Sequence, residues 1–244
     1  MSASSWTRYS AEHPDSELDS TLVAAYGSDI ADESRLRLAG NVEGKRVLHL
    51  GCGAGHASVA FARQGARVVG VDPSADQIAH ARRNAEEAEV RVELHQADVA
   101  DLAFIGADGI DVAFSAYGLA GVADLDRVFR SVHRLLKPEA PFVFSLPHPA
   151  FTMLDPTADQ PLLVRRAYTD RAPLRRGRGA RAHTDQPRTI SDTFTSLLRA
   201  NFRVDTLLEP EPDLDPEAPR SAHWHDAMAM VPPTVIFRGR KLGI

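Results

Sequence analysis

Between residues 46 and 148, short apolar runs alternate with longer amphipathic or alanine-rich stretches, and this alternation restricts the fold more than any other feature. The apolar runs, which we expect to be strands, cover 46–50, 67–71, 90–95, 110–114 and 141–146. The intervening stretches predict helices over 57–64, 74–88 and 124–136. Short strands that alternate with helices are typical of a parallel sheet covered by helices on both faces.

The pattern changes on either side of this alternating region. Apolar residues at positions 18, 22, 23 and 26 recur at helical spacing, so residues 1–40 are predicted to form an N-terminal helical lid. Residues 41–149 would form the core, and 150–190, with eight arginines between Arg165 and Arg188, an insert or cap built as a hairpin or a mobile loop. Residues 191–244 return to the core with a helix over 191–200 and strands over 202–208 and 234–237.

The composition is that of an ordinary globular protein, with 43% apolar and 25% charged residues. The net charge of -5 disfavours binding to nucleic acid or to anionic membranes. No apolar run approaches the roughly 20 residues needed to cross a bilayer, and the polar start gives no sign of a signal peptide. A single cysteine, Cys52, leaves no intrachain disulfide. We therefore expect a cytoplasmic monomer or homodimer.

Gly51, Gly53 and Gly55 form a loop where the first expected strand passes into a helix. Glycines there let the backbone approach a ligand closely, with amide groups exposed at the helix start. A dinucleotide-binding fingerprint has its third small residue one position later, where this chain has His56. The loop alone leaves several ligands open, but His56 argues against a dinucleotide.

Two acidic residues follow the next two strands. Asp72 ends the second strand, and a carboxylate there can accept hydrogen bonds from both ribose hydroxyls of an adenosine. Asp98, within Gln96–Val99, follows the third strand and can meet the exocyclic amine of an adenine. The glycine loop therefore has two partners suited to an adenosine-containing ligand.

The segments 47–55, 69–74, 96–99 and 135–138 together resemble class I S-adenosylmethionine-dependent methyltransferases, and among them the small-molecule and quinone-type branch. The resemblance implies a seven-stranded Rossmann-like sheet, mostly parallel with an antiparallel last strand and helices on both faces. It implies S-adenosylmethionine as the methyl donor and S-adenosylhomocysteine as the product.

The resemblance also assigns cofactor contacts. Gly51 and Gly53 would lie against the methionine part, Asp72 would hold the ribose, and Asp98 with Val99 would hold the adenine. The complete set that we expect at the cofactor is Gly51, Cys52, Gly53, Gly55, Asp72, Pro73, Gln77, Asp98, Val99, Ser115, Ala116 and Tyr117. For Gln77, a solvated position on the helix surface is an equal alternative.

One residue departs from the family's pattern. The family usually has an acid at the position of His49, where it helps to organise the cofactor's amine. With a histidine there, cofactor binding would rely more on backbone carbonyls or be weaker.

Catalysis has one candidate residue, His148, which two prolines flank after the fifth strand. A histidine titrates near neutrality and suits a general base or a substrate contact; the alternative is a loop histidine with local hydrogen bonds. Tyr117 is interpreted as a wall of the cofactor pocket. Trp6 and Tyr9 are candidates for a lid over the cofactor, with a terminus lacking fixed structure as the alternative.

Two further features have a functional and a neutral interpretation. His223 and His225 lack a clear third ligand, so no metal site is predicted. The arginines of the insert suit an acidic substrate, but a solvated face, neutralised by the acids between Glu209 and Glu217, is favoured.

These features lead to one main hypothesis about function. We expect methyl transfer to an oxygen or nitrogen of a small-molecule metabolite or natural product. One alternative is an RNA or protein methyltransferase; the acidic net charge disfavours RNA as the substrate. The other alternative is a non-catalytic module that binds S-adenosylmethionine.

Overall fold

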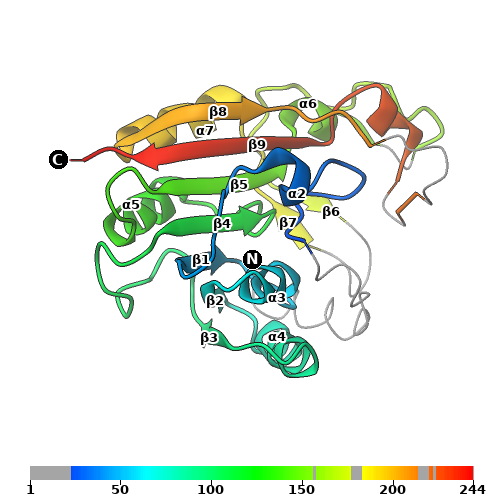
Figure 1. The fold of residues 1–244 in the computed structure, drawn as a ribbon. Helices are drawn as coiled ribbons and strands as arrows, with labels where there is room; N and C mark the ends of the chain where they lie inside the picture. The colour runs from blue at the N-terminus through cyan, green and yellow to red at the C-terminus, as the bar shows by residue number, and fades with distance from the viewer. Residues whose placement is uncertain (1–22, 156–157, 177–182, 214–219, 222–223, 244) are drawn as a thin grey trace.

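A seven-stranded sheet with the strand order β3-β2-β1-β4-β5-β9-β8 forms the centre of the molecule (Figure 1). The structure is a computed structural model that describes residues 23–155, 158–176, 183–213, 220–221 and 224–243. The strands of the sheet are β1 (Arg46–Leu50), β2 (Arg67–Asp72), β3 (Val92–Gln96), β4 (Val112–Ala116), β5 (Pro141–Pro147), β8 (Phe202–Leu208) and β9 (Thr234–Lys241). The first five pair in parallel, and β9 runs antiparallel to both β5 and β8. The mostly parallel sheet with an antiparallel last strand is thereby confirmed.

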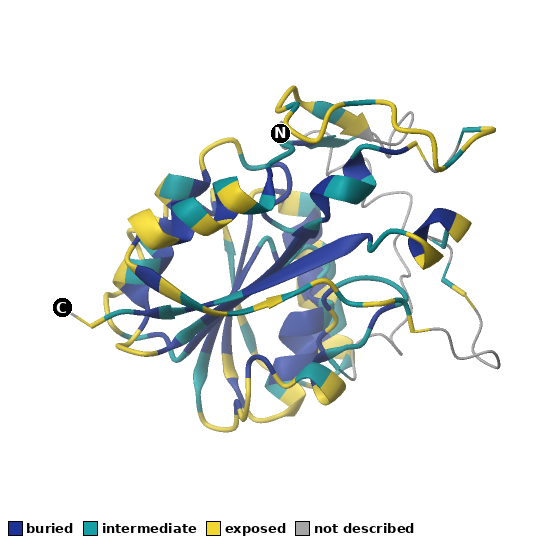
Figure 2. Cartoon of the chain, turned by 90° about the horizontal axis from the view of Figure 1, so that it is seen from above, coloured by how far each residue is buried: buried dark blue, intermediate teal, exposed yellow. Residues whose placement is uncertain are grey.

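Helices cover both faces of this sheet. The described helices are α2 (Glu33–Leu36), α3 (His56–Arg63), α4 (Ala75–Glu87), α5 (Leu125–Leu135), α6 (Pro149–Thr152), α7 (Ile190–Arg199) and the 3-10 helix η3 (Asp226–Ala229). Side chains of α5 and α7 share one apolar core with Phe142 and Phe144 of β5. Phe61 of α3 belongs to a second core with Tyr26 and Phe114. The central strands β1, β4 and β5 are accordingly the most deeply buried part of the sheet (Figure 2).

The main helices begin at polar caps that the sequence carries. Ser74 accepts a hydrogen bond from the amide of Gln77 at the start of α4, and Asp124 accepts one from the amide of Arg127 at the start of α5. Thr189 and Asp192 form a reciprocal capping box at the start of α7. None of the helices in the described ranges combines the length and the apolar content that a bilayer span requires.

The predicted N-terminal helical lid stays a prediction for residues 1–22, and the helix is wrong for residues 23–32. Positions 18 and 22 lie outside the described residues, and the described chain from 23 to 32 is not helical. Tyr26 instead serves as an anchor: its carbonyl accepts the Ser145 hydroxyl at 2.5 Å, and its phenol donates to Glu33. Hydrogen bonds to distant residues therefore override the helical spacing, and α2 is the only helix in the described part of the first 40 residues.

The expected insert contains a small hairpin, formed by β6 (Leu174–Arg176) and β7 (His183–Asp185). It lies beside the carboxyl end of β4 (Figure 1). The amide of Gln186 donates to the carbonyl of Ala120 at 2.8 Å, and Arg188 donates to the carbonyls of Val122 and Ala123. The segment after β7 is thus bonded to the loop that follows β4.

Some of the described arginines of the insert make contacts within the fold. Arg171 binds Asp192 with two hydrogen bonds of 2.8 Å, and Arg166 pairs with Asp170. Of the acids expected to neutralise the insert, Asp213 pairs instead with Arg35 near the N-terminus.

Candidate functional site

The glycine loop lies at the carboxyl end of β1, against the loop that follows β4. Gly51 has a φ of 61°, and a Cβ atom there would lie 2.6 Å from the Cα of Gly118. A Cβ on Gly118 would in turn lie 2.7 Å from the Leu50 carbonyl oxygen. Gly118 was not among the candidate residues, although a glycine shortly after a strand end is a signal for close backbone approach. Two glycines therefore allow the loops after β1 and β4 to touch.

Asp72 connects the glycine loop to the end of β2. Its carboxylate accepts the amide hydrogen of Gly53 at 2.9 Å and that of Ser74 at 2.9 Å. The side chain is buried, which raises its pKa, while the two amide hydrogen bonds act in the opposite direction. A carboxylate has about four acceptor positions, so two stay available to a ligand.

Gln77 on the first turn of α4 has a buried acceptor atom that lacks a partner. The residue is only 5% exposed, and its Oε1 atom has no hydrogen bond within the described structure. This oxygen lies 3.7 Å from where a Cβ of Gly53 would be, with nothing else within 4 Å of that position. Burial excludes the solvated alternative for Gln77. An unpaired buried acceptor costs about 1–3 kcal/mol, so this geometry fits a ligand that donates a hydrogen bond beside the glycine loop.

The remaining residues near the ends of β2 and β3 differ in exposure. Asp98 is exposed and accepts the amide hydrogen of Ala100 at 2.8 Å, whereas Val99 belongs to the core. Cys52 is buried, which raises the pKa of its thiol, and its amide donates to the carbonyl of Val71. Pro73 is exposed at the turn into α4. Asp98 and Pro73 are thus open to a ligand, and Cys52 holds the loop against β2.

The end of β4 carries the next three candidate residues. The Ser115 hydroxyl donates to the carbonyl of Leu50 at 2.8 Å, and Ala116 is half-buried. Tyr117 has a φ of 55°, unusual for a residue with a side chain, and its phenol is bonded to Thr234. Burial raises the pKa of Tyr117 to about 12. The phenol therefore stays protonated near neutral pH and lines the site as a neutral group.

His49, the residue that departs from the family's pattern, is buried and uncharged. Its Nδ1 atom lies 2.8 Å from the Ser58 hydroxyl, and its ring packs at 5.3 Å from that of Phe114. Burial, with a smaller contribution from His56, lowers the pKa of His49 to about 3. The strand end thus presents a neutral ring where an acid was expected.

His148 is buried at the start of α6, and both of its ring nitrogens have partners. Nδ1 accepts the amide hydrogen of Ala150 at 3.1 Å, and Nε2 lies 2.6 Å from a carboxylate oxygen of Glu209. Glu209, which directly follows β8, was expected among the acids that neutralise the insert and not as a partner of His148. The bond to Ala150 matches the alternative of a histidine with local hydrogen bonds, whereas Glu209 is a partner from a distant segment. A role of His148 as a base requires Nδ1 to release the amide of Ala150.

Three of the residues considered in the sequence are not described by the structure. Trp6, Tyr9 and His223 lie outside the described residues. Within the described part of the chain, no three histidine, cysteine or acidic side chains are grouped to hold a metal ion.

Comparisons with known proteins agree with this geometry. Residues 47–139 match the model of a family described as a methyltransferase domain. Ubiquinone biosynthesis O-methyltransferase of Pseudomonas syringae pv. tomato is 38% identical over 105 residues, which are 43% of this chain and 45% of that protein. The enzyme of the same description from Azorhizobium caulinodans is 36% identical over 124 residues, 51% of this chain and 46% of the relative. This chain therefore spans less than half the length of either relative.

Solved structures extend the likeness over most of the fold. A putative S-adenosylmethionine-dependent methyltransferase from Listeria monocytogenes superposes with a TM-score of 0.70 at 24% identity, covering 85% of this chain and 94% of the other. An S-adenosylmethionine-dependent methyltransferase from Mesorhizobium loti gives a TM-score of 0.65 at 25% identity, with 84% and 94% covered.

Proposed function

We propose that this chain is a class I S-adenosylmethionine-dependent methyltransferase that transfers a methyl group to a small molecule, because residues 47–139 match the model of a methyltransferase domain and the fold is similar to solved S-adenosylmethionine-dependent methyltransferases. The acceptor atom is an oxygen or a nitrogen. The names of the curated relatives, which are O-methyltransferases, favour oxygen.

The observation that carries the proposal is the joint placement of Asp72 and Gln77 at the glycine loop. Asp72 keeps two acceptor positions for the ribose hydroxyls. Gln77 offers an unpaired buried oxygen beside Gly53. Asp98 and Val99 would hold the adenine, and the main chain around Gly51 the methionine part. When bound, the cofactor supplies an electrophilic methyl group on its sulfonium, so the protein mainly has to align the acceptor and exclude water.

His49 changes how the amino group of the methionine part is held. A neutral imidazole lacks the charge of an aspartate, and burial keeps this ring neutral at physiological pH. The ammonium group of the cofactor therefore depends on main-chain carbonyls of the glycine loop.

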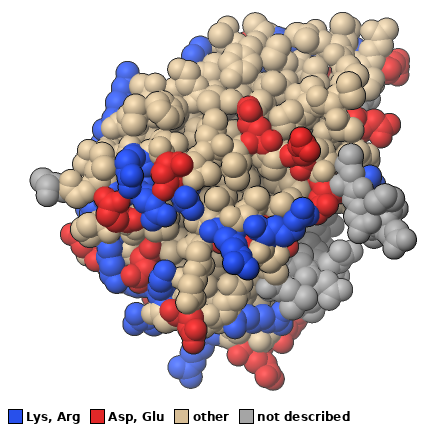
Figure 3. Space-filling model, turned by 45° about the horizontal axis from the view of Figure 1, so that its top comes forward, with Lys and Arg blue, Asp and Glu red and all other residues tan. Residues whose placement is uncertain are grey.

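Surface charge supports a small acceptor over RNA. The net charge is -5, and the face drawn in Figure 3 shows acidic and basic side chains intermixed over its described residues. Binding to a nucleic acid backbone depends on many basic side chains on one face. Protein methylation and cofactor binding without catalysis are the remaining alternatives. The following experiment distinguishes them from methylation of a small molecule.

The experiment is a transfer assay with methyl-labelled S-adenosylmethionine and a soluble metabolite extract, with RNA and protein fractions in parallel. We expect the label in small molecules, with S-adenosylhomocysteine as an inhibitor. Label in the RNA or protein fraction alone would reverse the choice of acceptor. Absence of label in every fraction, with S-adenosylhomocysteine bound, would support a non-catalytic module.

A further inference from the structure

Tyr117, directly after β4, is held in an unfavourable backbone conformation. Its φ of 55° lies in the left-handed region, where an aromatic residue is a rare outlier. Such a conformation persists only where the surrounding structure fixes it, and outliers of this kind gather at binding and catalytic sites. The contacts around Tyr117 must therefore offset its backbone strain.

The amide, the carbonyl and the phenol of Tyr117 all have hydrogen-bond partners. The amide donates to the main-chain oxygen of Ser145 at 3.2 Å and to the Ser145 hydroxyl at 3.3 Å. The carbonyl accepts the amide hydrogen of Ala120 at 2.9 Å, and the phenol is bonded to the hydroxyl of Thr234. Ser145 on β5 and Thr234 on β9 are both fully buried. Two strands of the sheet thus fix the turn at Tyr117.

Ser145 also joins this turn to the N-terminal segment 23–30, which lies beside the carboxyl end of β5 (Figure 1). The Ser145 hydroxyl donates to the carbonyl of Tyr26 at 2.5 Å and accepts the amide hydrogen of Tyr117. Tyr26 is fully buried, and a buried carbonyl is unfavourable without a donor. One hydroxyl therefore satisfies a donor on the loop after β4 and an acceptor on the segment before α2.

Gly27 brings the same N-terminal segment directly onto the side chain of Tyr117. A Cβ atom at position 27 would lie 2.9 Å from the hydroxyl oxygen of Thr234 and 3.1 Å from the phenol oxygen of Tyr117. A side chain at this position would displace either the segment or the two bonded hydroxyls. The absence of a side chain at Gly27 thus allows the segment to pack on the turn.

The turn at Tyr117 sets the position of the next residue, Gly118, which packs against the glycine loop. Gly118 and Gly51 approach so closely that neither has room for a Cβ atom. A rotation of the turn would therefore change the contact that supports the glycine loop. Ser145 can influence this loop only through Tyr117, because its strand β5 pairs with β4 and not with β1.

We propose that Ser145 is a positioning residue of the cofactor site, because its hydroxyl holds Tyr117 in the conformation that lets Gly118 pack against Gly51. The inference rests on the proposed function, since it takes the glycine loop as the site for S-adenosylmethionine. Without the hydroxyl, Tyr117 loses a contact that offsets its strain, and the carbonyl of Tyr26 loses a donor. The turn then relaxes, and the glycine loop is held less firmly for the cofactor.

The first test is calorimetric titration of S-adenosylhomocysteine into Ser145→Ala. We expect the affinity to fall by about 10-fold, which corresponds to the loss of one hydrogen bond. Thr193→Val is the matched control, because it removes a buried hydroxyl on α7 that donates to the main-chain carbonyl of Thr189. This control should bind the ligand like the wild type.

A double-mutant cycle distinguishes the positioning of Tyr117 from a general contribution of Ser145 to β5. Glycine adopts a positive φ without strain, so Tyr117→Gly removes the need for the Ser145 hydroxyl. Ser145→Ala should therefore weaken binding of S-adenosylhomocysteine much less in the Tyr117→Gly background than in the wild type. An equal loss in both backgrounds, or wild-type affinity of Ser145→Ala, would overturn the positioning role.

Gly27→Ala supplies a second variant if Ser145→Ala or Tyr117→Gly does not fold. Its methyl group would press on the hydroxyls of Tyr117 and Thr234, so the affinity for S-adenosylhomocysteine should fall. Gly106→Ala, whose Cβ would have nothing within 4 Å, should leave it unchanged. Equal affinity of these two variants would contradict the dependence of the cofactor site on the turn. Failure of the wild type to bind the ligand would instead overturn the proposed function, and this inference with it.

Discussion

Gly51 and Gly118 decide, at the scale of single residues, whether the loops after β1 and β4 can meet. Their closest approach leaves no room for a side-chain carbon on either residue. The triple-glycine motif made Gly51 predictable from the sequence. Gly118 belongs to no motif, and its importance appears only when β4 is placed next to β1.

We predict that Gly118→Ala lowers the free energy of unfolding by about 1–3 kcal/mol, the usual cost of overpacking a close contact. The added methyl group would lie 2.7 Å from the Leu50 carbonyl oxygen and 2.8 Å from the Cα of Gly51. Gly106→Ala is the matched control, because its Cβ would have nothing within 4 Å. Urea unfolding of both variants checks the prediction, and equal stability of the two would contradict it.

His49 leads to a second prediction at this scale, which concerns the pH dependence of stability. The unfolded imidazole takes up a proton below its ordinary pKa of 6.5, whereas the buried ring does so only near a pKa of about 3. Protonation therefore favours the unfolded chain in this window. The contribution of His49 to stability is complete above pH 6.5 and is lost as the pH falls towards 3.

Urea unfolding at about pH 7 and about pH 5 should show this loss in the wild type. His49→Gln lacks the titrating group, so its loss of stability between the two values should be smaller by on the order of 2 kcal/mol. Groups common to both proteins cancel in the comparison. An identical pH dependence would mean that the ring at position 49 can take up a proton in the folded state.

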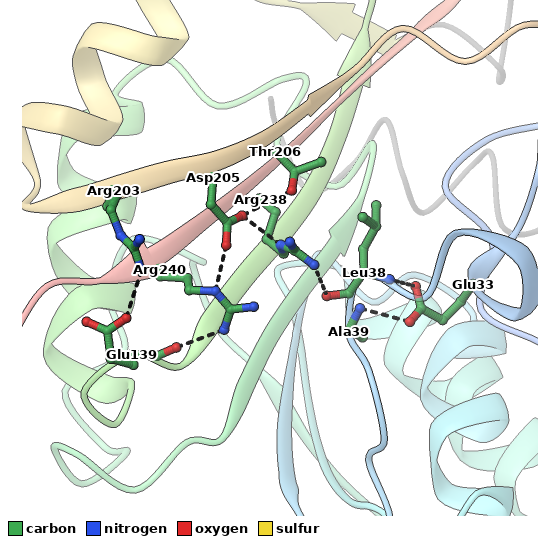
Figure 4. Close-up of polar contacts among 9 residues, drawn as sticks. All are labelled: Glu33, Leu38, Ala39, Glu139, Arg203, Asp205, Thr206, Arg238 and Arg240. Atoms are coloured by element: carbon green, nitrogen blue, oxygen red, sulfur yellow. Dashed lines mark hydrogen bonds and ion pairs between the residues drawn. The ribbon is translucent and has the colours of Figure 1, made fainter.

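At the scale of elements, the strands from β1 to β5 follow the apolar runs of the sequence to within two residues at each end. The last strand was predicted to end at 237, but β9 continues to Lys241. Arg238 and Arg240 look like the end of a strand in sequence. In the structure both donate hydrogen bonds to Asp205 of β8 (Figure 4). Contacts between distant segments therefore decide where this strand ends, and local pattern does not reveal them.

Asp205 should therefore contribute more to the stability of the fold than an exposed carboxylate does. Burial would raise its pKa, but hydrogen bonds from Arg238 and Arg240 reverse this effect and lower it. We predict that Asp205→Asn destabilises the fold by about 1–3 kcal/mol, because two partly buried guanidinium groups lose a charged acceptor.

The neighbouring pair of Arg203 and Glu139 supplies the control (Figure 4). Both side chains are more than half exposed, and exposed ion pairs contribute little. Glu139→Gln should change the melting temperature much less than Asp205→Asn. A larger effect at Glu139 would contradict this ranking of the two pairs.

At the scale of the whole molecule, the parts of the site that motifs describe were predictable and the parts that cover it were not. Asp72 and the glycine loop lie where the sequence placed them. Glu209 comes from a segment without a motif, and only the folded chain brings it to His148 at the end of β5. Sequence spacing carries no information about such long-range contacts, whereas the βαβ order already implies the position of Asp72.

Arg188 is one of the side chains that join the insert to the core, which gives a prediction at this scale. Arg188 is bonded to three carbonyls, two of them in the loop after β4. Arg188→Ala should raise KM for the methyl acceptor and increase proteolysis within the insert, while affinity for S-adenosylhomocysteine stays near the wild-type value. Arg165→Ala removes an exposed arginine of the same insert as a control. Equal proteolysis of the two variants would show that Arg188 does not hold the insert.

The most direct test of the account is calorimetric titration of S-adenosylhomocysteine into the wild type, Asp72→Ala and Asp76→Ala. Asp72 bonds the glycine loop and offers acceptors to the ribose, whereas Asp76 stands on the first turn of α4 without these contacts. We predict that the wild type and Asp76→Ala bind the ligand equally, and that Asp72→Ala binds at least about 10-fold more weakly. Absence of binding to the wild type, or equal binding by all three proteins, would contradict the assignment of the glycine loop as the cofactor site.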